Sequence, residues 1–168
     1  MIIKESNMIF GEYDENDVFY IEKSEIYSKL KSESVKATEF ILLRKNKILL
    51  IEAKTSTPNF EMCKNSDKKS KKYIDFINDI TKKFSDSIDI YSSLLLNYIH
   101  SNDFPKSFNK TRSAEIVLVL VIKKAFPTSL EHYKEKLEKE LKSKMKIWNI
   151  KRLLVISEEK AREKNLVT

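Results

Sequence analysis

The sequence predicts a single α/β domain over residues 1–168, in which helices flank one mixed β-sheet. Two apolar runs, Phe40–Leu43 and Ile48–Ile51, are separated by a short polar turn and predict an antiparallel hairpin. The continuous run at 114–124, AEIVLVLVIKK, is typical of a strand that is buried on both faces. A predicted helix and the apolar run at 151–157 follow it, so the last two strands are expected to lie parallel with a right-handed crossover.

The segment before the hairpin, DVFYIEKSEIYSKL at residues 17–30, has two interpretations. Either Val18–Ile21 forms a short strand that a helical turn follows, or Asp17 caps one helix that runs through the segment. The strands of the hairpin are expected at about 36–44 and 47–54. In both interpretations a further element of secondary structure leads into the hairpin.

Two helical segments are expected in the second half of the chain. Residues 67–99 predict one long helix, or two in series, because apolar side chains recur at spacings of three and four. These side chains are Tyr73, Ile77, Ile80, Phe84, Ile88, Tyr91, Leu95 and Tyr98. The sequence TSLE at 128–131 predicts a capping box that includes Glu131. It opens a helix whose inward side chains are Leu130, Leu137, Leu141 and Trp148, and a charged helix is expected after the last strand.

The composition excludes several kinds of functional site. One glycine, one cysteine and two histidines rule out a P-loop, a dinucleotide-binding fingerprint and an internal disulfide, and disfavour a structural zinc site. The net charge of +7 favours polyanionic partners. No apolar run approaches the roughly 20 residues of a membrane span, and the N-terminus lacks the pattern of a signal peptide, so a cytoplasmic protein without membrane partners is expected.

The hairpin brings acidic residues together at the end remote from its turn. A turn at 45–46 places Glu39 opposite Glu52, with Cβ atoms about 5 Å apart. Lys54 lies on the same face as Glu52, because side chains alternate along a strand. Two facing carboxylates repel each other unless a cation compensates them, and a hard divalent cation with oxygen ligands does so. We therefore predict a site for Mg²⁺ or Mn²⁺ at Glu39 and Glu52.

Such a site supplies what the hydrolysis of a phosphodiester needs. A bound metal polarises the phosphoryl oxygen, generates hydroxide and offsets the charge of the leaving group. A nearby lysine, here Lys54, orients or deprotonates the attacking water, or stabilises the developing negative charge. Each charged residue alone has a simpler interpretation as a solvated strand end or an exposed ion pair. Their combination in one register favours the metal site, and a single-residue bulge would break that register.

Glu39, the apolar hairpin and the tripeptide Glu52-Ala53-Lys54 resemble the PD-(D/E)XK nuclease superfamily. The similarity covers roughly residues 18–125. It implies a restriction-endonuclease-like fold in which Glu39 and Glu52 are the two acids of the motif and Lys54 is its lysine. It also implies that the backbone carbonyl of Ala53 is a further metal ligand.

The sequence departs from the family pattern in two respects. The first acid of the family is more often aspartate after a proline, whereas no proline precedes Glu39. The family's additional acid, from the element before the hairpin, has no clear counterpart, and Glu22 and Glu25 are the candidates. Of two further E-x-K tripeptides, the one at 140–142 lies in a predicted helix, and the one at 158–160 has no hairpin partner that offers an acid.

The resemblance implies a nuclease that depends on Mg²⁺ or Mn²⁺, specifically a DNA endonuclease of a bacterial restriction or anti-phage system, with DNA favoured over RNA. Lys68, Lys69 and Lys72 follow the E-x-K tripeptide and are candidates for contacts with substrate phosphates. Since the sequence has no base-reading motif, specificity is expected from elsewhere. A homodimer, or a partner subunit that supplies specificity, is the implied assembly.

Two other functions remain open. In the first alternative, the chain is a catalytically inert nuclease-fold module that binds nucleic acid or a partner protein. In the second, it is a small interaction domain in which the E-x-K tripeptide is accidental. Metal binding separates the nuclease from the interaction domain. Cleavage of nucleic acid separates the nuclease from the inert module.

Overall fold

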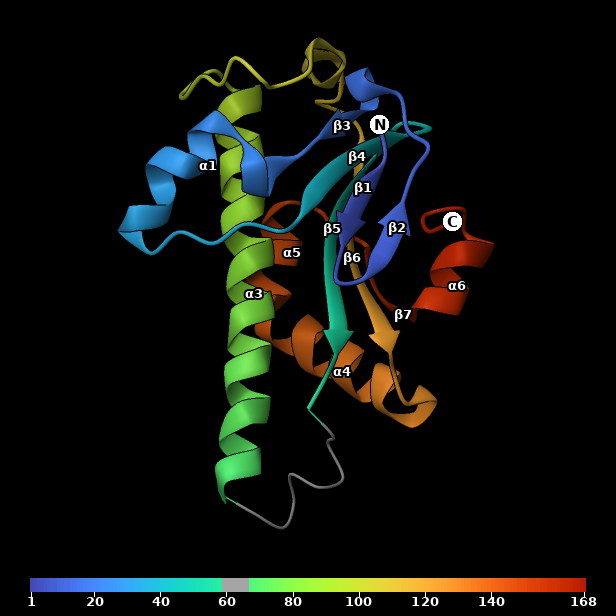
Figure 1. Ribbon diagram of the computed structural model, residues 1–168. Coiled ribbons are helices and arrows are strands. Elements are labelled where there is room, and N and C mark those ends of the chain that lie inside the picture. The colour runs from blue at the N-terminus through green and yellow to red at the C-terminus, as the bar shows by residue number, and fades with distance from the viewer. Residues whose placement is uncertain (59–66) are drawn as a thin grey trace.

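A five-stranded mixed sheet forms the centre of the protein in the computed structural model, which describes residues 1–58 and 67–168 (Figure 1). Its strands, in spatial order, are β3 (Val18–Phe19), β4 (Phe40–Arg44), β5 (Lys47–Ser56), β6 (Glu115–Lys124) and β7 (Arg152–Ser157). Strand β4 is antiparallel to β3 and β5, whereas β5, β6 and β7 are parallel to one another. The expected α/β class, with an antiparallel hairpin and parallel strands in one sheet, is confirmed.

Helices and a two-stranded hairpin cover the faces of this sheet. The helices are α1 (Glu25–Leu30), α3 (Asp67–Leu95), α4 (Pro127–Glu140), α5 (Lys142–Ile147) and α6 (Glu158–Glu163), with 3-10 turns at Glu15–Asp17, Ile21–Lys23, Lys31–Glu33 and Lys106–Lys110. The hairpin is β1 (Ile3–Glu5) with β2 (Met8–Phe10). One face of the sheet packs against α3 and α4, and the other packs against the β1–β2 hairpin and α6 (Figure 1). No helix in the described ranges is long and apolar enough to cross a membrane.

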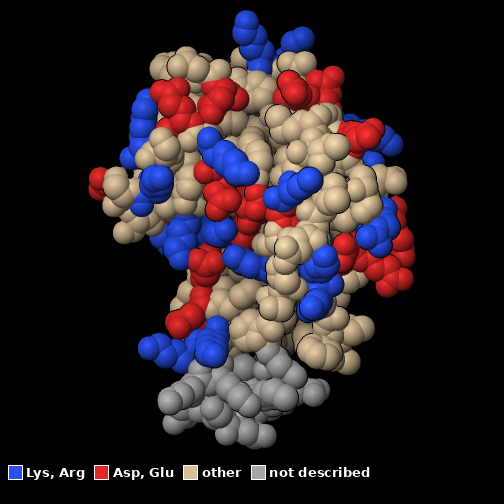
Figure 2. Space-filling model, in the orientation of Figure 1, with Lys and Arg blue, Asp and Glu red and all other residues tan. Residues whose placement is uncertain are grey.

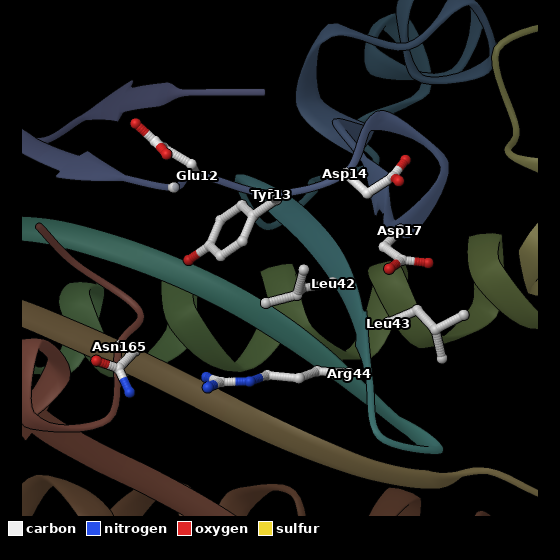
Figure 3. Close-up of a pocket in the computed structure, with 9 residues that line it drawn as sticks. Glu12, Tyr13, Asp14, Asp17, Leu42, Leu43, Arg44 and Asn165 are labelled. Carbon is white, nitrogen blue, oxygen red and sulfur yellow. The ribbon is translucent and has the colours of Figure 1, made fainter.

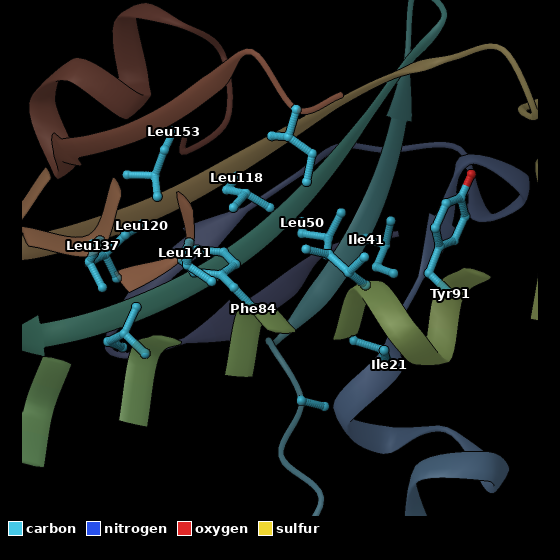
Figure 4. Packing of buried hydrophobic residues seen from close by; sticks show 14 of the residues in the cluster. Ile21, Ile41, Leu50, Phe84, Tyr91, Leu118, Leu120, Leu137, Leu141 and Leu153 are labelled. Atoms are coloured by element: carbon cyan, nitrogen blue, oxygen red, sulfur yellow. The ribbon is translucent and has the colours of Figure 1, made fainter. Parts of the chain in front are cut away.

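Helix α3 is one continuous helix of 29 residues whose apolar stripe packs on the sheet (Figure 4). The stripe is buried from Tyr73 to Tyr91, and Phe84 in its middle is fully buried in the same cluster as Leu50 of β5. Burial of such a side chain contributes about 1.5–3 kcal/mol, so the stripe holds α3 in a fixed position against β5. The expected stripe extends too far, because Tyr98 lies beyond the end of the helix and is 80% exposed.

The β4–β5 hairpin has the expected register. Leu43 pairs with Ile48, and Phe40 pairs with Ile51. Residues 45–46 both have positive φ values, as a two-residue hairpin turn requires. The paired strands contain no bulge, so every side chain of the hairpin lies on the face that the alternation predicts.

Strand β4 is shorter than expected, because it begins at Phe40 and not near residue 36. The backbone N–H of Lys36 donates to the carboxylate of Asp86 on α3 at 2.8 Å. The N–H of Thr38 donates to Ser87 Oγ, also on α3, at 2.8 Å. These side chains supply acceptors for the N–H groups of Lys36 and Thr38, and residues 36–39 do not pair in the sheet.

The segment before the hairpin follows the first of its two interpretations. Strand β3 leads into a 3-10 turn and then into α1, and the single helix capped by Asp17 does not form. Ser24 is the N-cap of α1, since its Oγ accepts a hydrogen bond from the N–H of Tyr27 at 3.1 Å. The strand and helix are both short, which is why the apolar spacing fitted either interpretation.

The capping box expected at 128–131 is wrong. Helix α4 begins at Pro127, with Phe126 as its N-cap and no hydrogen bond from a capping side chain. Proline suits the first helical position because its φ is already helical and it has no N–H that needs an acceptor. The helix therefore begins ahead of TSLE, and Glu131 forms an ion pair with Lys134 at 3.2 Å.

Candidate metal centre

Glu39 and Glu52 lie next to each other on the face of the sheet that packs against α3. The last pair of the hairpin joins Phe40 to Ile51, Glu39 and Glu52 are the residues next to this pair, and Lys83 Nζ lies within 4 Å of both of their carboxyl groups. The two side chains are buried, with 5% and 0% of their residue surfaces exposed. Carboxylates are almost never fully buried without partners, so their contacts decide what the site can do.

The cation between the two carboxylates is the ammonium group of Lys83, which comes from α3. Its Nζ lies 2.9 Å from Oε1 and 3.1 Å from Oε2 of Glu52, and 3.8 Å from Oε1 of Glu39. Lys54 Nζ lies 3.0 Å from Glu52 Oε1. The charge repulsion that led us to predict a metal is therefore compensated by two lysines of the chain itself.

Asp79 extends this network towards solvent. It lies one turn before Lys83 on α3, and its Oδ2 is 3.6 Å from Lys54 Nζ. Its Oδ1 accepts a hydrogen bond from Lys36. Partial burial raises the pKa of Asp79, but Lys36 and Lys54 outweigh that effect, so the pKa is lowered and the carboxylate stays charged. Carboxylates and ammonium groups thus alternate from the buried Glu52 on β5, through Lys54 and Asp79, to the more exposed Lys36.

Three carboxyl groups meet on the other side of Glu39. One oxygen each of Glu5, Glu22 and Glu39 lies within 4.8 Å of the others. Glu5 comes from β1, and Tyr20 donates a hydrogen bond to it. Glu39 Oε2 is buried, and no hydrogen-bond donor of the described residues reaches it. In the space-filling view of Figure 2, acidic side chains lie near the middle of the visible surface, with Lys and Arg side chains around them.

The pKa values of this centre depend strongly on burial. Burial raises the pKa of Glu39 to about 9, and the nearby carboxyls of Glu22 and Glu52 act in the same direction. Burial also raises the pKa of Glu52, against the effect of Lys83 and Lys54. For Lys83, burial lowers the pKa, but the charge and hydrogen bonds of Glu52 outweigh it and the pKa is raised. At neutral pH, Glu39 therefore holds a proton beside Glu22, and Lys83 is charged beside Glu52.

The two candidates for the additional acid lie in different places. Glu22 is in the carboxyl cluster, and its backbone N–H also donates to the carbonyl of Glu39 at 3.3 Å. Glu25 is exposed on α1, where it accepts from Lys29 at 2.6 Å and from Asn102 at 3.0 Å. Of these two candidates the fold brings only Glu22 to Glu39.

The carbonyl of Ala53, which the resemblance makes a metal ligand, accepts a hydrogen bond from Ser6 Oγ at 2.9 Å. Ser6 is in the turn of the β1–β2 hairpin, and its own carbonyl accepts from Thr55 Oγ1 at 3.2 Å. The turn of the β1–β2 hairpin thus packs beside the part of β5 that continues past its pairing with β4. A carbonyl has two lone pairs, so one remains on Ala53 besides the bond to Ser6.

Of the lysines expected at substrate phosphates, Lys72 is the one whose side chain the structure describes, and it is not part of this cluster. Lys72 is exposed on α3. It lies eleven residues before Lys83, which corresponds to about 16 Å along the helix. Lys68 and Lys69 belong to the first turn of α3, and their side chains lie outside the described residues.

Lys83, Asp79 and Glu5 belong to the site but were missed in the sequence. Lys83 had a weak signal, since it stands at the edge of the apolar stripe, next to Phe84, where a charge needs a partner. Asp79 is four residues before Lys83 and so shares its face of the helix. Glu5 had no signal, because only the long-range docking of the β1–β2 hairpin brings it to Glu22.

A hollow lies at the turn end of the hairpin, around Arg44 (Figure 3). It has a volume of about 420 Å³, and the Arg44 guanidinium extends in it towards Asn165, donating to the backbone carbonyl of Lys164 at 2.8 Å. An adjoining hollow of about 530 Å³ shares Arg44 and is also lined by Lys45 and Lys110. Arg44 is five residues from Glu39, which corresponds to about 17 Å along the strand.

Comparison of the chain with protein-family models, with curated proteins and with solved structures gives no significant match. The arguments about function therefore come from the residues and the geometry described above.

Proposed function

We propose that this protein is a divalent-metal-dependent phosphodiesterase that cleaves nucleic acid, with DNA favoured over RNA, in the manner of the PD-(D/E)XK nucleases. The observation that carries the proposal is the buried carboxyl of Glu39. One of its oxygens has no donor within the described residues, and it stands between Glu22 and Glu5 on one side and Glu52 on the other. Carboxyl groups gathered in this way bind a hard cation, which prefers oxygen ligands.

The donor set supports Mg²⁺ or Mn²⁺ in particular. Glu5, Glu22 and Glu39 offer only oxygen atoms, and within residues 1–58 and 67–168 no histidine or cysteine belongs to the cluster. Burial and the nearby carboxyls of Glu22 and Glu52 raise the pKa of Glu39, and a divalent ion bound there would act against this rise. These three residues would hold the ion, and Glu52 would join them if Lys83 moves away. In the family pattern the additional acid precedes the hairpin, as Glu22 does here.

Lys54 is the residue of this chain best placed to act on a phosphodiester. A bound metal ion would polarise the phosphoryl oxygen and lower the pKa of a water molecule. Lys54 is 27% exposed, about twice as much as Lys83 at 13%, so its ammonium group is the more accessible to a substrate. From that position it would donate to a phosphoryl oxygen or orient the attacking water. Asp79 and Glu52 hold it there through their ion pairs.

The test is cleavage of supercoiled plasmid and of labelled single-stranded DNA and RNA with Mn²⁺. We expect metal-dependent cutting of DNA that EDTA abolishes, and a loss of at least about 100-fold in rate for Lys54→Ala, the size of a typical acid–base contribution. Lys47→Ala is the matched control, because Lys47 stands on the same strand near the turn and pairs with Glu115. Cutting by Lys54→Ala at the wild-type rate would contradict the role of Lys54. No cutting of any substrate would contradict the proposed activity.

The proposal extends to a restriction or anti-phage setting and to a homodimer or a specificity subunit, on the strength of the resemblance alone. Sedimentation of the protein with and without a DNA duplex separates a monomer from a homodimer. A duplex cut on both strands at once by a dimer would support the dimeric form.

A catalytically inert module that binds nucleic acid is the second candidate, and Lys83 is the observation that favours it. Its ammonium group already compensates Glu52 and approaches Glu39, so the carboxylates are stable together without a metal. The hollows at Arg44 would then be the binding surface. Lys45 and Lys110, which line one of them, form no ion pair within the described residues and are free to meet phosphates.

We expect the double variant Lys45→Glu/Lys110→Glu to weaken the binding of a DNA duplex by about tenfold at low salt, because phosphate contacts act through counterion release. The slope of affinity against salt concentration should become shallower. Lys139→Glu/Lys146→Glu, at exposed positions on α4 and α5, is the control for the same change in net charge. Fluorescence anisotropy with a labelled duplex measures all three proteins. Equal losses in the double variant and the control would show that the hollows are not a binding surface.

A further inference from the structure

Lys83 lies between Glu39 and Glu52, at a position on α3 that the packing of the helix fixes. It follows Ile80 and precedes Phe84 on α3, and both of these side chains are fully buried against the sheet. The backbone of Lys83 is therefore fixed, and its side chain is only 13% exposed. Its Nζ contacts both oxygens of Glu52 and approaches Glu39.

These contacts conflict with a metal ion at the same carboxylates. Both oxygens of Glu52 already bond an ammonium group, and Oε1 bonds that of Lys54 as well. Glu39 Oε2 is the oxygen of this pair that no donor reaches within the described residues. An ion that used both Glu39 and Glu52 would stand within a few ångströms of the Lys83 ammonium, and two positive charges so close repel strongly in a buried site.

We propose that Lys83 is a displaceable internal cation: it holds Glu39 and Glu52 together before a divalent ion binds, and it leaves Glu52 when the ion arrives. This inference rests on the proposed function, because it requires a metal at these carboxyls. It makes Lys83 a positioning residue, since its ammonium group keeps the side chains of Glu39 and Glu52 near each other within the folded protein. It also makes the affinity for metal the outcome of a competition between the ion and the ammonium group.

The test measures Mn²⁺ affinity by titration calorimetry, without nucleic acid. Lys83→Met removes the competing charge and is expected to bind Mn²⁺ about tenfold more tightly or better than the wild type. Lys83→Arg keeps the charge and can bond a carboxylate through two N–H groups, so it is expected to bind Mn²⁺ more weakly than the wild type. Lys82→Met is the control at the next position, where the lysine is 44% exposed and pairs with Asp86, and it should bind like the wild type.

Thermal unfolding gives a second reading on the same variants. Lys83→Met leaves Glu52 with Lys54 alone, so its melting temperature should fall without metal, and Mn²⁺ should raise it more than it raises that of the wild type. If Lys83→Met does not fold at all, the Mn²⁺ affinity of Lys83→Arg relative to the wild type tests the inference.

The outcomes separate this inference from the proposed function. Wild-type protein that binds Mn²⁺, with Lys83→Met binding equally or more weakly, overturns the inference and leaves the proposed function intact. Lys83→Arg binding as tightly as the wild type also overturns it. If neither the wild type nor Lys83→Met binds Mn²⁺, both proposals are wrong, and the cluster is a structural ion-pair network.

Discussion

Glu52→Leu is expected to lower the free energy of unfolding by about 3 kcal/mol, although leucine is the better residue for a buried strand position. Glu52 is fully buried, and its carboxylate is the closest anion to Lys83 and to Lys54. Without it, the one ion pair left to the Lys83 ammonium among the described residues is the 3.8 Å contact with Glu39. An unpaired buried charge costs several kcal/mol, which exceeds the gain from one apolar side chain. Urea denaturation in the presence of EDTA measures the effect.

The double variant Glu52→Leu/Lys83→Met is expected to be more stable than either single variant, because it removes both charges and leaves an apolar pair. The interaction energy from this cycle should be at least about 2 kcal/mol. The pair Arg152–Glu115 on β7 and β6 is the control, since its two side chains are 47% and 32% exposed. Glu115→Leu should change the stability by about 1 kcal/mol or less. Additive effects of Glu52→Leu and Lys83→Met would contradict a buried ion pair.

The second large effect concerns pH and the carboxyl of Glu39. In the unfolded chain this group has its ordinary pKa of 4.5, and burial raises it to about 9 in the folded protein. The folded state therefore binds more protons than the unfolded state between these two values, and the stability falls as the pH rises through that window. The slope from this one group is up to about 1.4 kcal/mol per pH unit. This slope is absent at pH values below the pKa of Glu39 in the unfolded chain, where the folded and the unfolded states both hold the proton.

Glu39→Gln removes the titrating group and keeps its shape, so this variant should lose the slope. At pH 5 the two proteins should be of similar stability, and at pH 8 the variant should be more stable than the wild type by about 2 kcal/mol or more. Urea denaturation from pH 5 to pH 9 with EDTA measures the difference. Glu25→Gln is the control: Lys29 lowers the pKa of Glu25, so any effect of that group falls below pH 4.5 and outside the window. An unchanged slope in Glu39→Gln would mean that Glu39 is ionised in the folded protein.

The two predictions concern one property of the centre, which is how the protein tolerates buried acidic groups without a bound ion. A proton neutralises Glu39, and Lys83 with Lys54 compensates Glu52. The first device depends on pH, because Glu39 loses its proton as the pH rises. Under the proposed function, a divalent ion would compensate both carboxylates, so Mn²⁺ should abolish the pH slope of the wild type as well as raise its stability.

The hairpin shows how much of the site the sequence could predict. The strand lengths, the two-residue turn and the alternation of side chains are local properties, and they put Glu39, Glu52 and Lys54 on one face in the correct register. The parallel strands after the hairpin followed from two further apolar runs and the helix between them. Local rules were weaker at element ends, where Pro127 opened α4 ahead of the expected cap.

What the sequence determined by itself was therefore the sheet, its helices and the need for a cation between two facing acids. The nature of that cation was decided by tertiary structure, because Lys83 is distant in sequence from the hairpin and reaches Glu52 only when α3 packs on β5. The same holds for Glu5, which the docked β1–β2 hairpin brings to Glu22. Charge compensation acts through distances of a few ångströms, and sequence periodicity fixes such distances within one element or one hairpin but not between packed layers.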